Sequence, residues 1–193
     1  MTALPSIREP DILLTFEEFA ALSLQEPSEL VEGRIVSMAR NNPTHSHLVT
    51  QFASCLNPWA RERGFGKVFS GDVAIITKRN PDTGRGADLA VVSHERLTGQ
   101  PANAAALEIA PELIIEVISP SNMWADLMDK LTEYFHIGTG QVWIVTPSTQ
   151  TLQVYRSVTD VTGFSVAERP VLTESELLPG LKLDLRDVFA GVA

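Results

Sequence analysis

Apolar residues occur along the chain in runs that have the spacing of strands or of helices. In residues 112–118, ELIIEVI, successive side chains would point to opposite faces of an extended chain, and both faces would be largely apolar. Strand-like runs also occur at residues 68–77, 87–92 and 141–147. The run at 112–118 is therefore expected to be a strand that is buried on both faces of a sheet.

Helical spacing appears in two longer segments. Residues 44–59 are expected to form an amphipathic helix with Thr44 as its N-cap. Residues 122–137 are expected to form a second helix, which ends at Gly138. The polar stretch 119–121 stops the preceding strand and can cap this second helix. The apolar positions of the first helix are Leu48, Phe52, Cys55, Leu56 and Trp59.

The N-terminal part of the chain is predicted to contain a short helix and a hairpin. Thr15 can cap the helix, and Glu18 three residues later completes a capping box. In residues 28–38, Gly33 and Arg34 separate two strand-like runs, which is the pattern of a hairpin. We therefore expect a hairpin to be added at the N-terminal side of the main sheet.

The order of these elements predicts the fold class. A helix, three strands, a helix and a strand follow one another, which predicts an α/β or α+β fold with a central mixed sheet flanked by helices. Two further strands are expected at residues 151–157 and 180–189, the second with a short helical end. A chain of 193 residues is expected to form one domain over residues 1–193, with its core at about residues 15–185.

Charge is unevenly distributed along the chain. The net charge of −9 argues against a protein that coats nucleic acid electrostatically. Residues 40–85, however, contain seven basic residues and three acids, so this stretch is +4 and the rest of the chain is −13. The stretch fits either an ordinary solvated surface or a surface that faces phosphate. In the second case the DNA-binding residues would be Arg61, Arg63, Lys78 and Arg79.

The sequence also predicts the cellular location of the protein and limits its metal ligands. Prolines and charges interrupt the first eleven residues before any apolar run long enough for a signal peptide, and no later run approaches a membrane span. A cytoplasmic protein without a membrane partner is therefore expected. The single cysteine, Cys55, excludes an internal disulfide and a multi-cysteine zinc motif. A bound metal would need oxygen or histidine ligands.

Glu116 is an unusual residue in the predicted buried strand, because it places a carboxylate between apolar side chains. A carboxylate among aliphatic side chains is costly unless it is neutralised, paired with a cation or bound to a metal. Asp88 begins the strand-like run 87–92, and if the two strands pair, the two carboxylates can converge at one edge of the sheet. Two hard oxygen ligands suit Mg²⁺, which keeps several waters. Glu116 could instead be an edge residue that pairs with an arginine.

A lysine on the second helix is a candidate partner for these acids. Asp126, Lys130 and Tyr134 follow at i, i+4 and i+8, so they share one face of the helix. The adjoining Leu127 and Leu131 suggest that this face turns toward the protein. A positive side chain would help to stabilise the extra charge on a phosphorus under attack. Taken alone, Lys130 could equally be a solvated helix residue.

The chain resembles the Uma-two family of the PD-(D/E)XK restriction-endonuclease-like superfamily, a family long catalogued as a domain of unknown function. The resemblance covers nearly the whole chain, and its most specific part is Glu-Val-x-Ser-Pro-Ser followed by the spaced Asp, Lys and Tyr. The matching segments are ELVEGRIVSM with Glu29 and Gly33, the His45 that begins HSHLV, ADLAVV, PELIIEVISPS, the series Asp126, Lys130 and Tyr134, GQVWIVTP and LPGLKLDL.

The resemblance implies a restriction-endonuclease-like fold and roles for individual residues. Asp88 and Glu116 would be the metal-binding acids, and Lys130 would supply the amine that the superfamily usually carries two residues after the glutamate. In this chain that usual position is Ile118. Glu29 would orient a metal-bound water. His45 matches the histidine of the family, and Tyr134 would be a supporting group.

Two further positions depart from the pattern of the family. Ala87 replaces the proline that normally precedes the aspartate, and this should matter little because the proline provides no ligand. Thr146 replaces an aspartate of the WxVDP-like segment, so any role of that acid is absent here. Both acids and the lysine are retained.

The expected function is Mg²⁺-dependent endonucleolytic hydrolysis of DNA, with Mn²⁺ as a possible substitute and a homodimer as the expected assembly. The main alternative is a catalytically silent module that keeps the nuclease fold. A second alternative uses the same two acids without metal to hydrolyse a glycoside. A zinc site at His45 and His47 is a further alternative, although residues two apart on a helix point about 200° apart.

Overall fold

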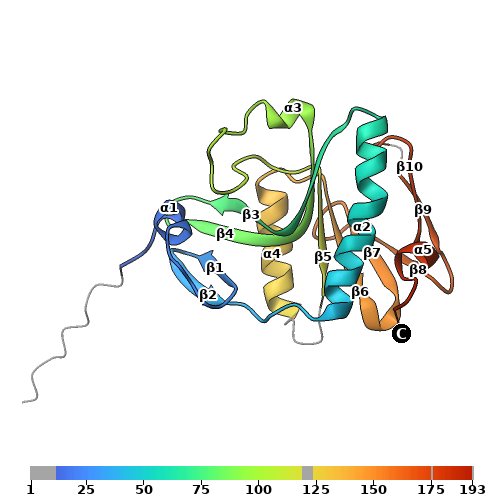
Figure 1. Cartoon of the computed structure of the whole chain (residues 1–193), viewed down its shortest axis with the longest axis horizontal. Coiled ribbons are helices and arrows are strands. Elements are labelled where there is room, and N and C mark those ends of the chain that lie inside the picture. The colour runs from blue at the N-terminus through green and yellow to red at the C-terminus, as the bar shows by residue number, and fades with distance from the viewer. Residues whose placement is uncertain (1–11, 119–123, 175, 193) are drawn as a thin grey trace, which may run out of the picture.

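The computed structural model describes residues 12–118, 124–174 and 176–192 (Figure 1). The expected strand stop and helix cap at residues 119–121 lies outside the described residues. The elements are α1 (Phe16–Ala20), β1 (Ser28–Val31), β2 (Arg34–Ser37), α2 (Pro43–Glu62), β3 (Gly66–Lys78), β4 (Thr83–Ser93), α3 (His94–Leu97), β5 (Leu113–Val117), α4 (Trp124–His136), β6 (Gln141–Thr146), the 3₁₀ turn η1 (Pro147–Thr149), β7 (Thr151–Tyr155), β8 (Val161–Ser165), β9 (Val171–Glu174), β10 (Leu181–Asp184) and α5 (Leu185–Val188).

An eight-stranded mixed sheet forms the centre of the molecule. Its strands lie in the order β2-β1-β4-β5-β6-β7-β8, and β3 pairs with β4 outside this path. Strands β5 and β6 are parallel and are connected through α4, whereas the other pairs of this sheet are antiparallel. Strands β9 and β10 form a small second sheet. The predicted fold class, a central mixed sheet flanked by helices, is confirmed.

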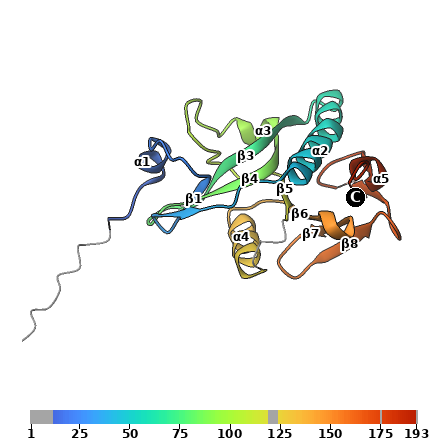
Figure 2. The ribbon, with the colours of Figure 1, turned by 60° about the horizontal axis from the view of Figure 1, so that its bottom comes forward.

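Helices α2 and α4 cover opposite faces of the sheet (Figure 2). Leu48 and Phe52 of α2 pack in one core, and Leu131 and Tyr134 of α4 pack in the other. Alternate residues of β5 enter the two cores, and the whole strand is buried, as its sequence predicts. A carboxylate on β5 is therefore held in an apolar setting from both sides.

The N-terminal helix and hairpin form as predicted, with a shifted turn. The Thr15 side chain accepts from the Glu18 amide, and the Glu18 carboxylate accepts from the Thr15 amide, which completes the capping box. In the hairpin, the two turn residues are Glu32 and Gly33, with φ of 50° and 73°. This places the turn one residue before the predicted Gly33–Arg34. Paired positive φ values suit the twist of a tight hairpin.

Helix α2 is the longer of the two sheet-covering helices, with 20 residues. The expected cap at Thr44 is wrong, because the Asn42 side chain accepts from the His45 amide and Pro43 occupies the first turn. Asparagine is a strong cap, and the fixed φ of proline favours helix entry directly after it. No helix in the described part of the chain is long and apolar enough to cross a membrane.

The sequence-based prediction missed α3, β8 and β9. Strand β8 lies at the edge of the sheet and pairs only with β7 in the described residues, so its pattern of burial is weak. Strand β9 contains four residues, and its partner β10 lies after an intervening connection. Short edge strands give little periodicity from which to predict them.

Candidate active site

The pairing of β4 with β5 brings Asp88 and Glu116 together. Leu89 lies opposite Ile115 in an antiparallel register, so the next pair toward the strand end is Asp88 and Glu116. The Val117 amide donates a hydrogen bond of 2.7 Å to Oδ2 of Asp88. The two acids thus lie side by side, as expected from the sequence, but Asp88 is in the middle of β4 rather than at its start, because β4 begins at Thr83.

Glu116 is held by groups from α4. The Tyr134 hydroxyl donates to Oε1 of Glu116 at 2.8 Å, and the Lys130 ammonium lies 4.0 Å from the same oxygen. Burial raises the pKa of Glu116 to about 7, even though the charge of Lys130 acts in the opposite direction. Burial and the neighbouring Glu116 also raise the pKa of Tyr134 well above its usual value.

Lys130 lies between Glu116 and the acid of the N-terminal hairpin, Glu29. Its Nζ is 2.6 Å from Oε1 of Glu29, and it also donates to the Gly86 carbonyl at 3.4 Å. Burial alone would lower the pKa of Lys130, but the nearby charges of Glu116 and Glu29 raise it above its usual value. The lysine is therefore a fixed positive charge that faces the two strand acids.

Arg85 and Glu133 complete this network, and sequence reasoning missed both. The Arg85 guanidinium donates to Oε2 of Glu29 at 3.1 Å and to Glu133 at 2.8 and 2.6 Å. The Thr77 hydroxyl also donates to Glu133. Arg85 stands in a strand that is buried along most of its length. A charge in such a strand is the same signal that singles out Glu116.

His45 approaches Asp88 from the first turn of α2. Its Nε2 is 2.9 Å from Oδ2 of Asp88, and the side chain is buried. Burial lowers the pKa of His45, but the hydrogen bond to Asp88 together with the negative charges of Asp88, Asp72 and Glu116 outweighs it, and the net shift is upward. His47 does not converge with it, because Nε2 of His47 lies 3.0 Å from the carbonyl oxygen of Ala190. The geometry gives no support to a shared zinc site.

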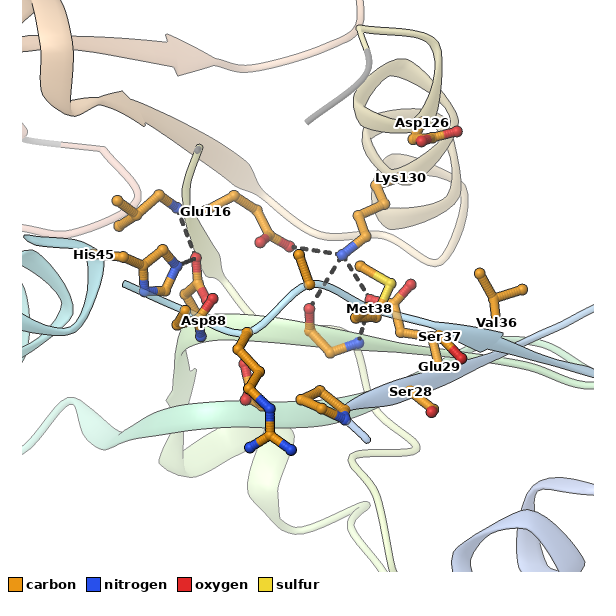
Figure 3. A pocket seen from close by; sticks show the side chains of 17 residues that line it. Ser28, Glu29, Val36, Ser37, Met38, His45, Asp88, Glu116, Asp126 and Lys130 are labelled. Carbon is orange, nitrogen blue, oxygen red and sulfur yellow. Dashed lines mark hydrogen bonds and ion pairs between the residues drawn. The ribbon is translucent and has the colours of Figure 1, made fainter. Parts of the chain in front are cut away.

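A cavity of about 710 Å³ is lined by Glu29, His45, Asp88, Glu116 and Lys130, among other residues. Figure 3 shows His45 directed toward Asp88 and Lys130 directed toward Glu116 and Glu29, while Asp126 lies apart from them on α4. Tyr134 is fully buried behind Glu116. The structure therefore gathers the six residues proposed for the site, which are Glu29, His45, Asp88, Glu116, Lys130 and Tyr134.

The two strand acids can accept a divalent cation. In the described residues, no hydrogen bond or ion pair reaches Oδ1 of Asp88 or Oε2 of Glu116. No three histidine, cysteine or acidic side chains of the described chain form a complete metal cage. Mg²⁺ needs no such cage, because it binds through one or two carboxylates and takes its other ligands from water and phosphate. The donor set thus fits Mg²⁺.

The four basic residues expected to bind DNA lie in two separate places. Arg61 and Arg63 lie at the C-terminal end of α2, at the opposite end from His45. Lys78 and Arg79 lie at the far end of the β3–β4 hairpin. Lys78 pairs with Glu32, and the Arg79 guanidinium contacts three acids: Glu17, Asp82 and Glu108.

Comparison with known proteins identifies the family. A family model described as "Uma2: Putative restriction endonuclease" matches residues 16–186. The chain belongs to the Uma2 family. A solved structure described as "a putative nuclease belonging to DUF820 from Anabaena variabilis ATCC 29413" is 22% identical, with 93% of this chain and 99% of that chain covered and a TM-score of 0.76. This likeness shows that the fold is shared. No curated protein matches the chain.

Arg85 is expected to stabilise this Uma2 protein strongly. Its side chain is only 10% exposed, and Arg85→Met would leave the carboxylates of Glu29 and Glu133 without their shared cation. We expect a loss of about 3–5 kcal/mol in the free energy of unfolding, measured by urea titration. Arg186→Met is the matched control, because the Arg186 side chain is 61% exposed and solvent screens its pair with Asp184, so we expect a much smaller loss. Equal losses in the two variants would contradict a structural role for the buried pair.

Glu116 is expected to make the metal-free protein less stable as the pH rises. Its pKa is about 7 in the folded protein and about 4.5 when unfolded, so the folded state holds the extra proton between these values. Stability should therefore fall from pH 4.5 to pH 7, by on the order of 3 kcal/mol for this group. Glu116→Gln should flatten the pH profile of the melting temperature in EDTA. Parallel profiles for the two proteins would exclude the raised pKa.

Proposed function

We propose that this Uma2 protein is a Mg²⁺-dependent endonuclease that hydrolyses DNA phosphodiester bonds. The observation that carries the proposal is the convergence of Asp88 and Glu116 with the Lys130 ammonium on the wall of one cavity. Family membership and the shared fold support a nuclease. Asp88 and Glu116 lie on the adjacent strands β4 and β5, and Lys130 of α4 lines the same cavity, so a phosphate group that enters the cavity would meet both acids and the ammonium.

Asp88 and Glu116 would hold the ion through Oδ1 of Asp88 and Oε2 of Glu116. When bound, Mg²⁺ supplies a Lewis acid that lowers the pKa of water and stabilises charge on a phosphoryl oxygen. Mn²⁺ has a similar preference for oxygen ligands and is expected to substitute. Binding requires the carboxylate form of Glu116, which the raised pKa opposes at neutral pH in the absence of metal.

The protein side chains have separate roles in this proposal. Lys130 orients the attacking water and stabilises the charge that develops on the phosphate, because its ammonium lies 4.0 Å from Glu116. Glu29 and Arg85 fix the position of Lys130 through the 2.6 Å and 3.1 Å contacts. His45 orients Asp88, and Tyr134 orients Glu116. None of these supporting contacts uses the free oxygens of the two acids.

A paired experiment on the wild-type protein tests the function. Mg²⁺ is titrated into the protein by calorimetry, and supercoiled plasmid is incubated in the same buffers with and without EDTA. Metal binding together with metal-dependent nicking is expected. Metal binding without nicking, or neither, would favour the catalytically silent module instead. We also infer a homodimer, because two copies can cut two strands, and light scattering of the purified chain at assay concentration tests this.

A further inference from the structure

Residues 33–61 contain no aspartate or glutamate, although the chain has 24 acids in all. The segment carries Arg34, Arg40 and Arg61, so the rest of the chain has a net charge of −12 compared with −9 for the whole. It comprises β2, the connection to α2 and almost all of α2. One end of this segment borders the candidate active-site cavity, and the other lies at the C-terminal end of α2.

The outward face of α2 is polar and uncharged along most of its length. The hydroxyls of Thr50 and Ser54 donate to the carbonyls of Ser46 and Thr50 in the preceding turns, at 2.9 and 2.8 Å. The helix itself carries no carboxylate before Glu62, its last residue. The exposed polar residues of the face are Ser46, Thr50, Ser54 and Asn57.

Near the C-terminal end of α2 lie two cations, Arg61 of the helix and Lys67 of β3, that have no acidic partner among the described residues. Arg61 and Lys67 line a second cavity of about 350 Å³ together with His94, and no acid is among its lining residues. In the described residues neither Arg61 nor Lys67 forms an ion pair, whereas Lys78 and Arg79 are both paired. Unpaired cations in an acidic protein are available to an external anion.

The near end of the helix also offers a cation. Arg40 lines the candidate active-site cavity, and its side chain is 70% exposed. Its pairing with Glu26 at 3.4 Å involves two exposed side chains, and such pairs contribute little energy. A phosphate can therefore replace Glu26 as the partner of Arg40 at little cost.

We propose that the outward face of α2 is a docking surface for the phosphate backbone of duplex DNA, extending from Arg40 at the active-site cavity to Arg61 and Lys67. The proposal rests on the proposed nuclease function. His45 and Arg61 are separated along the helix by about 24 Å, because each residue adds about 1.5 Å. This span corresponds to about seven base-pair steps of a duplex. Hydroxyl and amide side chains are common partners of phosphate oxygens.

Binding of a 24-base-pair duplex to matched variants tests the proposal. Anisotropy is measured in EDTA, where cleavage does not occur, over a series of salt concentrations. Thr50→Glu places a carboxylate in the middle of the docking surface, and Thr132→Glu is its control, because Thr132 is an exposed threonine of α4 whose hydroxyl also donates to the carbonyl four residues before it, at 2.8 Å. We expect Thr50→Glu to weaken binding at least tenfold and Thr132→Glu to change it less than twofold.

Charge reversal at the far end gives a second readout. The double variant Arg61→Glu with Lys67→Glu should reduce the slope of log affinity against log salt by about two, since each lost phosphate contact contributes about 0.9. Lys182→Glu, an exposed lysine on β10, is the control and should leave the slope unchanged.

The outcomes separate this proposal from the nuclease function. Wild-type affinity and slope in Thr50→Glu and in the double variant would overturn the docking surface even if the wild-type protein nicks DNA. An absence of salt-dependent DNA binding in the wild-type protein would overturn it too. Suppose that Thr50→Glu and the double variant lose DNA binding, their controls do not, and the wild-type protein never nicks plasmid. This result would support the docking surface and contradict the nuclease proposal.

Discussion

Asp88→Asn and Glu116→Gln proteins are expected to lose Mg²⁺ binding and plasmid nicking together. Each substitution replaces a carboxylate by an amide of the same shape and preserves a hydrogen-bond acceptor for Val117 or Tyr134. Removing groups that only support metal ligands already costs about 10–100-fold in metal affinity. Loss of a ligand should therefore weaken Mg²⁺ binding by more than about 100-fold. Calorimetric titration and initial nicking rates measure the two effects.

Asp126→Asn is the matched control for these two substitutions. Asp126 lines the same cavity, and its substitution removes the same charge. Its side chain, however, is exposed and lies apart from Asp88 and Glu116 (Figure 3). We expect its Mg²⁺ affinity and nicking rate to remain within about threefold of the wild-type values. If Asp126→Asn is as defective as Glu116→Gln, general charge in the cavity matters and the assignment of two specific ligands is wrong.

Lys130→Met is expected to separate catalysis from metal binding. The substitution removes the ammonium that lies 4.0 Å from Glu116 and 2.6 Å from Glu29. Loss of one positioned group that stabilises charge in the transition state typically costs about 10²–10³ in rate. Mg²⁺ affinity should be retained or increased, because the local negative charge rises. Nicking rates at saturating Mg²⁺, together with calorimetry, give the comparison.

The lysine assignment has a matched control at Lys182. Lys182→Met removes an exposed lysine on β10, away from the cavity, and should leave both nicking and metal affinity unchanged. Lys130→Met protein that nicks within threefold of the wild-type rate would show that this lysine takes no part in the reaction. Loss of metal binding in the same protein would point to a structural collapse of the site instead.

Local patterns predicted much of the fold and the site. Alternation along residues 112–118 identified the buried strand β5, and the position of Glu116 in it identified an unusual carboxylate. The i+4 spacing of Lys130 and Tyr134 predicted that they face the same neighbour, and both contact Glu116. The resemblance to the Uma-two family is confirmed by the match over residues 16–186.

Contacts between distant segments were beyond the reach of periodicity. Arg85 and Glu133 are 48 positions apart, and only the folded chain places them within 2.6 Å of each other. The basic residues of the +4 stretch also lie in separate places. Arg61 is in the last turn of α2, whereas Arg79 pairs with Glu17 and Asp82. The cap at Asn42 rather than Thr44 shows that a single helix end depends on competition between nearby residues.

The acid-free segment at residues 33–61 has a consequence for the rate of encounter with DNA. The rest of the chain has a net charge of −12, so most approach directions are repulsive toward a polyanion. Electrostatic repulsion would reorient or repel a duplex that approaches the acidic surfaces, whereas a duplex aligned with α2 could make contact. The acidic remainder of the protein then acts as an orientation filter, which reduces the number of collisions but raises the fraction that begin with the scissile strand near the cavity.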